Sequence, residues 1–137
     1  MSTNKLIIYT DGGARNNPGP AGIGIVFFDE QKNIIQKHKE YIGERTNNQA
    51  EYEALVKALE LAKGKAKNLE FFLDSQLVVN QAKGIYKVKN SEIRELLFKV
   101  RILEQEFNEI KYNLIPREKN KLADKLVNQS IDEALKI

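Results

Sequence analysis

A change in the spacing of apolar residues near Thr46 constrains the fold of this chain more than any other feature of its sequence. Residues 5–10 and 23–29 are largely apolar, and residues 33–42 mix apolar with polar residues. Short connections join the three segments, which predict three consecutive strands in an antiparallel meander. After Thr46 the spacing becomes helical, at residues Ala54, Leu55, Ala58, Leu59 and Ala62. An antiparallel first half is therefore followed by a half that contains helices.

Turn-forming residues are concentrated between the first two predicted strands. Residues 11–22 (DGGARNNPGPAG) contain four glycines, two prolines and two asparagines, and this composition predicts a loop over the whole segment. The segment has neither a Walker-type GKS or GKT sequence nor a GxGxxG that follows a strand. A nucleotide-binding loop is therefore not expected.

The second half alternates helices and strands. Thr46 or Asn47 can cap a first helix that ends before Gly64. A strand, two helices, a strand and a helix are then predicted at residues 69–73, 75–83, 91–108, 110–115 and 121–135. The order βββαβααβα predicts an α/β fold with a five-stranded mixed sheet flanked by helices, and the length fits a single domain over residues 1–137.

Two residue types that carry much enzyme chemistry are scarce. The chain has no cysteine and one histidine, which excludes disulfides, thiolate zinc sites and cysteine nucleophiles, and argues against a Ser-His-Asp triad. That histidine, His38, lies in a predicted strand and is expected to be structural or exposed. The N-terminal apolar run before Asp11 is too short for a signal peptide or a membrane span, so we expect a soluble cytoplasmic protein with no membrane partner. We also expect a monomer.

Four acidic residues stand at positions with more than one interpretation. Asp11 and Asp74 each follow an apolar strand, where they can also form an Asx-turn or a helix cap. Glu51 shares the apolar stripe of its helix, where a carboxylate must be paired, protonated or bound to metal. Alternatively, Glu51 is close enough to the helix start for solvent and the helix dipole to tolerate it. Asp124 lies in the first turn of the last helix, where negative charge is favourable in any case.

Taken together, the four acidic residues indicate a metal site. If the first and fourth strands are neighbours, Asp11 and Asp74 meet at one edge of the sheet, and Glu51 and Asp124 can reach that edge from their helices. Carboxylates crowd together only around cations, because each charge raises the cost of the next. Two ions about 4 Å apart form the usual clamp for phosphodiester displacement. We therefore expect two Mg²⁺ ions per site, with Mn²⁺ as a substitute.

Four segments resemble, in order and spacing, the signature segments of type 1 ribonuclease H, particularly its short archaeal and bacterial subgroup. They are TDGGARNNPGPAGIG, TNNQAEYEAL, DSQLVVNQ and PREKNKLADKLVN, and the resemblance runs from about Leu6 to Asn128. It implies an endoribonuclease that hydrolyses the RNA strand of RNA–DNA hybrids by two-metal-ion catalysis, leaving 5′-phosphate and 3′-hydroxyl ends. The metal-binding quartet that it implies is Asp11, Glu51, Asp74 and Asp124.

The same resemblance implies residues that contact the substrate. Thr46 matches a threonine that holds a DNA-strand phosphate, and the polar residues that match minor-groove contacts are Asn17, Asn47, Asn48 and Gln76. The minor groove of an A-like helix is wide and shallow, and it displays 2′-hydroxyls and base edges to short amide side chains. Turn and cap chemistry is the alternative role of these residues. Gly12 and Gly13 are expected to let the backbone approach the substrate closely.

The chain departs from the family pattern in two places. Many members carry a histidine in a loop before the last acidic residue, whereas here Arg117 is the one plausible stand-in, and arginine cannot exchange protons near neutral pH. The tryptophan-bearing basic handle of some relatives is also absent, so residues 84–90 with Lys87 and Lys89 are expected to form a reduced contact for the DNA strand. No separate hybrid-binding domain is expected to precede the catalytic one.

Charge alone leaves the role of this region open. The segment from Lys83 to Arg101 contains six basic and two acidic residues, which fits either a solvated helix face or a binding surface for phosphates.

Double-stranded RNA or a branched DNA junction are alternative substrates for the same fold. A non-catalytic nucleic-acid-binding domain is a further alternative, because a fold does not fix a function. The presence of all four acidic residues favours catalysis.

Overall fold

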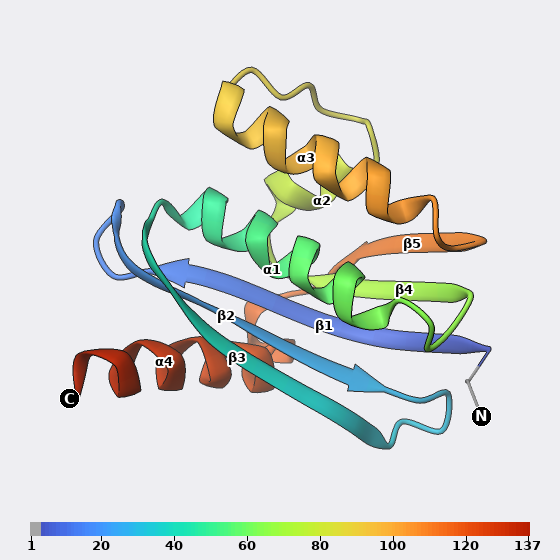
Figure 1. Ribbon diagram of the computed structural model, residues 1–137, viewed down its shortest axis with the longest axis horizontal. Coiled ribbons are helices and arrows are strands. Elements are labelled where there is room, and N and C mark those ends of the chain that lie inside the picture. Colours follow the sequence, from blue (N-terminus) through green and yellow to red (C-terminus); the bar gives the residue numbers. More distant parts are fainter. Residues whose placement is uncertain (1–3) are drawn as a thin grey trace.

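The computed structural model describes residues 4–137, which form a five-stranded mixed sheet with the spatial order β3-β2-β1-β4-β5 (Figure 1). The strands are β1 (Lys5–Ala14), β2 (Gly19–Phe28), β3 (Ile34–Arg45), β4 (Asn68–Leu73) and β5 (Glu109–Leu114). β1, β2 and β3 pair in antiparallel fashion, while β4 runs parallel to both β1 and β5. The predicted meander and the predicted element order are confirmed.

Helices cover both faces of the sheet (Figure 1). α1 (Asn47–Ala62) lies on one face with α2 (Gln76–Ala82) and α3 (Ser91–Glu104) beside it, and α4 (Lys121–Leu135) lies on the opposite face. The sheet and α1 enclose most of the apolar core, whose largest fully buried side chains include Ile8, Ile25, Phe27, Tyr52, Leu55 and Phe71. Among residues 4–137, no helix combines the length and hydropathy needed to cross a bilayer.

The prediction of a loop over residues 11–22 is wrong in its extent. β1 continues to Ala14 and β2 starts at Gly19, so only residues 15–18 form the turn. The glycines serve close packing of helices on the sheet. A Cβ atom on Gly12 would lie 2.2 Å from the carbonyl oxygen of Ala50 in α1, and a Cβ on Gly22 would lie 2.0 Å from Oγ of a serine in α4. The glycine-rich composition of this segment therefore reflects the close packing of β1 and β2 between α1 and α4.

The helix predicted over residues 91–108 ends four residues earlier, at Glu104. The backbone N–H groups of residues 105–107 each donate to the carbonyl three residues earlier, which is the hydrogen-bond pattern of a 3-10 turn and ends the α-helix. The N–H of Asn108 then donates to the carbonyl of Lys67 over 2.7 Å, and β5 begins at the following residue. The apolar spacing continues past the helix because Phe107 packs against the same core.

The parallel register of β1 and β4 determines where the functional residues lie. Tyr9 pairs with Phe72, and two residues further along each chain stand Asp11 and Asp74. Since both strands run in the same direction, their carboxyl-terminal ends meet at one edge of the sheet. The first turns of α1 also lie against this part of β1, as the contact of Gly12 with Ala50 shows.

Candidate functional site

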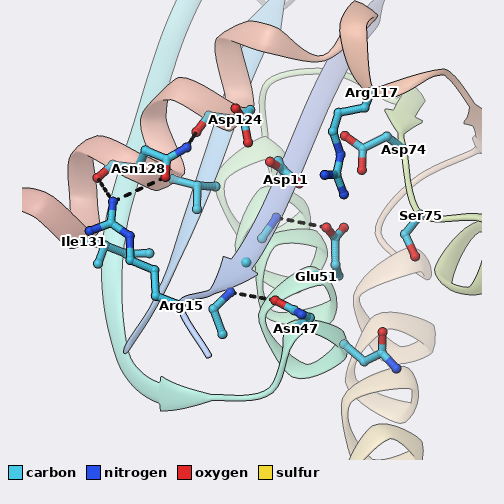
Figure 2. Close-up of a pocket in the computed structure, with 15 residues that line it drawn as sticks. Asp11, Arg15, Asn47, Glu51, Asp74, Ser75, Arg117, Asp124, Asn128 and Ile131 are labelled. Atoms are coloured by element: carbon cyan, nitrogen blue, oxygen red, sulfur yellow. Dashed lines mark hydrogen bonds between the residues drawn. The ribbon is translucent and has the colours of Figure 1, made fainter. Parts of the chain in front are cut away.

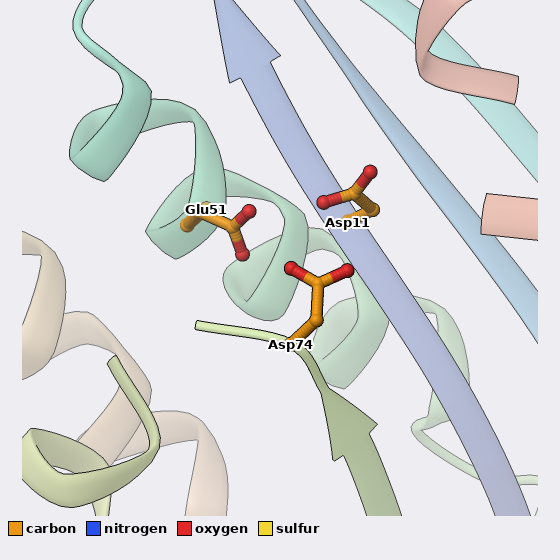
Figure 3. Close-up of side chains that lie close together, drawn as sticks. All are labelled: Asp11, Glu51 and Asp74. Atoms are coloured by element: carbon orange, nitrogen blue, oxygen red, sulfur yellow. The ribbon is translucent and has the colours of Figure 1, made fainter. Parts of the chain in front are cut away.

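Three carboxylates from three separate elements gather at this edge of the sheet. Asp11 of β1, Glu51 of α1 and Asp74, which follows β4, each offer an oxygen, and these oxygens all lie within 4.8 Å of one another. In Figure 3 the three side chains point toward a common centre. Asp11 and Glu51 are each only 8% exposed. The expected meeting of Asp11 and Asp74 through neighbouring strands is confirmed.

The electrostatics of the three carboxylates favour a bound cation. Burial raises the pKa of Asp11 to about 7, and the negative charges of Asp74 and Asp124 act in the same direction. Burial, followed by the charge of Asp11, raises the pKa of Glu51 well above its usual range. Glu51 accepts a hydrogen bond from the N–H of Gly12 on Oε1 at 3.4 Å, while its buried Oε2 has no hydrogen-bond partner among residues 4–137. An ion with oxygen ligands would satisfy that oxygen and relieve the repulsion, so the cluster can hold a metal ion.

The acidic cluster lies in a cleft of about 460 Å³ between α1, α4 and the ends of β1 and β4 (Figure 2). Asp124, in the first turn of α4, lines this cleft but is exposed and lies outside the group of three. Arg117, in the 3-10 helix η1 (Arg117–Lys119), also lines it, and Figure 2 shows its side chain extending toward the acidic cluster. With Arg15 also in its lining, the cleft combines three acidic residues of the cluster and Asp124 with two guanidinium groups.

Ser75, and not Asp74, is the residue that caps α2. Oγ of Ser75 accepts a hydrogen bond from the N–H of Val78 over 3.3 Å and caps α2. Asp74 thus remains available to the cleft. Asp124 does occupy the first turn of its helix, as expected, so a favourable interaction with the helix dipole accompanies its place at the cleft.

The polar residues near the start of α1 hold the local backbone together. Thr46 is the N-cap of α1 and forms a capping box with Gln49. Oδ1 of Asn17 accepts from the N–H of Asn47 over 2.9 Å, and Oδ1 of Asn47 accepts from the N–H of Ala14 over 2.8 Å. Turn and cap chemistry is therefore present at these positions. Asn47 also lines the cleft, beside Gly12, Gly13 and Asn48.

Five of the expected substrate contacts lie outside the cleft lining: Asn17 and Thr46, near the start of α1, and Gln76, Lys87 and Lys89. Gln76 is exposed at the start of α2, and Lys87 and Lys89 are exposed in the segment that joins α2 to α3. At the end of the same basic stretch, Arg101 pairs with Glu104 and donates to the carbonyl of Ala82 over 2.7 Å. Arg101 is therefore engaged in contacts within the protein.

Two features of the cleft have no clear signal in the sequence. The Arg15 guanidinium pairs with Asp132 over 2.7 Å and contacts Asn128, which ties the turn after β1 to α4. Asn120 is 1% exposed, and its Nδ2 donates to Oδ2 of Asp74 over 3.0 Å. A single asparagine before a helix resembles an ordinary cap in a sequence, so only the packed structure reveals its contact with the acidic cluster.

The sheet order and the acidic cluster where β1 and β4 end define the class of protein, a ribonuclease H-like fold with a carboxylate site. Residues 9–130 match the family described as reverse transcriptase-like. Ribonuclease H1 of Halobacterium salinarum has a similar structure, with a TM-score of 0.92, 36% identity, and 95% of this chain and 99% of that chain covered. LC11-RNase H1, isolated from compost, gives a TM-score of 0.92 at 50% identity, with 97% and 99% covered. The chain belongs to the type 1 ribonuclease H family.

Some relatives are considerably longer than this chain. A bifunctional protein of Mycobacterium tuberculosis is 39% identical over 132 residues, which is 95% of this chain and 36% of that protein. The match to the full-length ribonuclease HI of Halobacterium salinarum, 38% identical, covers 95% of this chain and 66% of that protein. The chain thus spans about a third to two thirds of the length of these relatives.

Proposed function

We propose that the chain is an endoribonuclease that hydrolyses the RNA strand of RNA–DNA hybrids and leaves 5′-phosphate and 3′-hydroxyl ends. The buried cluster of Asp11, Glu51 and Asp74 in an open cleft is the observation that carries this proposal. Family membership supports the substrate class, since LC11-RNase H1, 48% identical in that structure, has been solved in complex with an RNA/DNA hybrid. We propose that residues 1–137 act as one catalytic domain and as a monomer.

The carboxylates are proposed to hold two divalent cations, with Asp124 completing the ligand set from α4. Mg²⁺ is the proposed ion and Mn²⁺ a substitute, because both accept hard oxygen ligands. When bound, such ions supply Lewis-acid stabilisation of charge on the reacting phosphate and its attacking and leaving oxygens. The chain contributes the fixed positions: Asp11 on a central strand, Glu51 on a helix packed against that strand, and Asp74 at the end of the neighbouring strand.

The rim of the cleft is proposed to bind the hybrid. Asn47 and Asn48 line the cleft, and Asn17 lies beside them through its hydrogen bond to the N–H of Asn47. Exposed amide groups at this rim can read 2′-hydroxyls and base edges in the shallow minor groove. The hydroxyl of Thr46 accepts a hydrogen bond in the capping box, and its own hydrogen is left to donate to a phosphate oxygen.

The remaining proposed contacts extend the binding surface beyond the cleft. Gly12 and Gly13 contribute backbone that lines the cleft next to the acidic cluster. Gln76 follows Asp74 by two residues and is exposed, which suits a contact to the strand bound at that end. Lys87 and Lys89 are proposed to contact phosphates of the DNA strand, because both are exposed in a segment without helix or strand.

Arg117 is proposed to neutralise charge at the reacting phosphate. Its side chain extends into the cleft beside Asp74, where a guanidinium can form charge-assisted hydrogen bonds to phosphate oxygens. A guanidinium group stays protonated near neutral pH, so an arginine does not act there as a general acid. Proton transfer to the leaving oxygen is therefore assigned to solvent.

A panel of end-labelled duplexes of one sequence tests the proposed substrate. RNA–DNA, RNA–RNA, DNA–DNA and DNA with one embedded ribonucleotide are each incubated with Mg²⁺, with Mn²⁺ and with EDTA. Metal-dependent cutting of the RNA in the hybrid is expected, and double-stranded RNA is the alternative substrate because it shares the A-like minor groove. No cutting of any duplex with either ion would contradict the proposal.

A further inference from the structure

Asn120 occupies a capping position but does not cap. It is the residue before α4, where an asparagine side chain normally accepts a hydrogen bond from a backbone N–H of the first turn. No such side-chain hydrogen bond is present at α4. The side chain is instead directed away from the helix, and only 1% of the residue is exposed.

Both hydrogens of the Asn120 amide are used to connect the two strands of the acidic cluster. Nδ2 donates to the carbonyl of Thr10 over 2.9 Å and to Oδ2 of Asp74 over 3.0 Å. Thr10 directly precedes Asp11 on β1, and Asp74 follows β4. The Asn120 amide therefore contacts the carboxylate of Asp74 and the backbone next to Asp11.

The conformation of the Asn120 side chain lowers the stability of the folded protein. An N-cap hydrogen bond from asparagine contributes about 0.5–2 kcal/mol, and a buried polar atom without a partner costs about 1–3 kcal/mol. Oδ1 of Asn120 is buried and has no hydrogen-bond partner in the part of the chain that the structure describes. A side chain selected for stability alone would cap α4 and leave no buried oxygen unpaired. Residues that lower stability in this way are characteristic of functional sites.

We propose that Asn120 is a positioning residue that holds the Asp74 carboxylate in its metal-binding orientation. With Oδ2 held by Nδ2, the carboxylate cannot rotate freely away from Asp11 and Glu51, toward which it points in Figure 3. The same contacts fix the start of α4 on the sheet and so fix Asp124, four residues later. Outer partners that orient ligands in this way strengthen metal binding. The inference rests on the proposed metal-dependent function.

Two substitutions separate positioning from stability. Asn120→Ala removes the amide. Asn120→Ser also loses the contact with Asp74, because the serine side chain is too short to reach it, but serine is a strong helix cap. Asn113→Ala is the matched control, since Nδ2 of Asn113 donates in the same manner to Oε2 of Glu70 and to the carbonyl of Phe71, both over 3.1 Å, and does not line the cleft.

Mn²⁺ binding to each variant is measured by calorimetry without substrate, and melting temperatures are recorded with Mn²⁺ and with EDTA. Asn120→Ala and Asn120→Ser are expected to bind Mn²⁺ about tenfold or more weakly and to lose most of the Mn²⁺-induced rise in melting temperature. Asn120→Ser should melt in EDTA at or above the wild-type temperature, and Asn113→Ala should bind Mn²⁺ as the wild type does. Wild-type Mn²⁺ affinity in folded Asn120→Ser would overturn the inference, as would an equal loss in Asn113→Ala. These readouts do not involve cleavage, so an inactive wild type that binds Mn²⁺ would refute the proposed function and leave this inference standing.

Discussion

The N–H of Gly12 donates to Oε1 of Glu51 over 3.4 Å, a contact that exists because α1 passes directly against β1 at this glycine. The carbonyl of Ala50 and the N–H of Glu51 occupy the space that a Cβ atom on Gly12 would need. The position of Glu51 in the acidic cluster therefore depends on the absence of a side chain one residue after Asp11.

Gly12→Ala is expected to separate α1 from β1. A Cβ atom there would lie 2.2 Å from a backbone oxygen, so the helix must move, and such overpacking costs about 1–3 kcal/mol or more. Cleavage of the hybrid should fall strongly because Glu51 moves with the helix. Gly13→Ala is the control for stability alone, since its Cβ would meet only Cγ1 of Val127 at 3.7 Å, an ordinary contact. Equal melting temperatures for the two variants would contradict this account.

Asp11→Asn is expected to stabilise the protein when metal is removed. Because the folded state raises the pKa of Asp11 to about 7, it favours the protonated form more than the unfolded state does. The free energy of unfolding in EDTA should therefore fall as the pH rises from about 4 through about 7. The substitution removes this contribution, so the variant should melt above the wild type near pH 8 and differ less near pH 5. A variant that melts below the wild type near pH 8 in EDTA would argue against repulsion within the cluster.

Substitution of Arg117 should reduce the rate of cleavage without changing its pH dependence. Loss of a positive group aimed at the reacting phosphate is expected to lower the single-turnover rate by about tenfold or more, with Arg117→Lys less affected than Arg117→Ala. Lys119→Ala tests the same short helix without altering the cleft lining, and it should cleave as the wild type does. A pH–rate profile that changes slope in Arg117→Ala would indicate a proton-transfer role instead.

Binding of the hybrid should weaken as the salt concentration rises, because contacts between basic side chains and phosphates contribute to it. Replacing Lys87 and Lys89 together by alanine should weaken binding and lower the slope of log K against log salt by about 1 for each lost contact. Lys32 and Lys67 are also exposed but do not line the cleft. They lie in the β2–β3 and α1–β4 connections, at the opposite end of the sheet from the carboxyl ends of β1 and β4 (Figure 1), so their joint replacement is the control. Equal effects of the two pairs would show that only net charge matters.

Much of the fold could be predicted because its elements have clear periodicity and boundaries. The cap at Thr46 and the residues of α4 follow directly from local sequence. The extent of β1 could not be predicted, because the glycines that suggest a turn are required by helices that pack on both faces of the strands. The end of α3 at Glu104 depends on the hydrogen bond between Asn108 and Lys67, which are distant in sequence.

The acidic cluster was predictable from strand order, whereas its surroundings were not. Asp11 and Asp74 follow neighbouring parallel strands, so their meeting is a consequence of topology. The contact of Asn120 with Asp74 joins residues 46 positions apart, and neither local composition nor periodicity contains information about it. The involvement of Asn17 and Asn47 in holding the backbone likewise emerges only from their mutual contacts.

A cleavage assay of Asp11→Asn is the most direct test of whether the acidic cluster is a metal-dependent active site. Single-turnover hydrolysis of end-labelled RNA in a hybrid is measured with Mg²⁺, together with hybrid binding, for the wild type, Asp11→Asn and Glu60→Gln. Glu60 is an exposed acidic residue of α1 outside the cleft, so its variant controls for the loss of one negative charge. Asp11→Asn is expected to bind the hybrid without cutting it, while Glu60→Gln is expected to cut at the wild-type rate. Wild-type cleavage by Asp11→Asn would contradict the assignment of the acidic cluster as the metal-dependent active site.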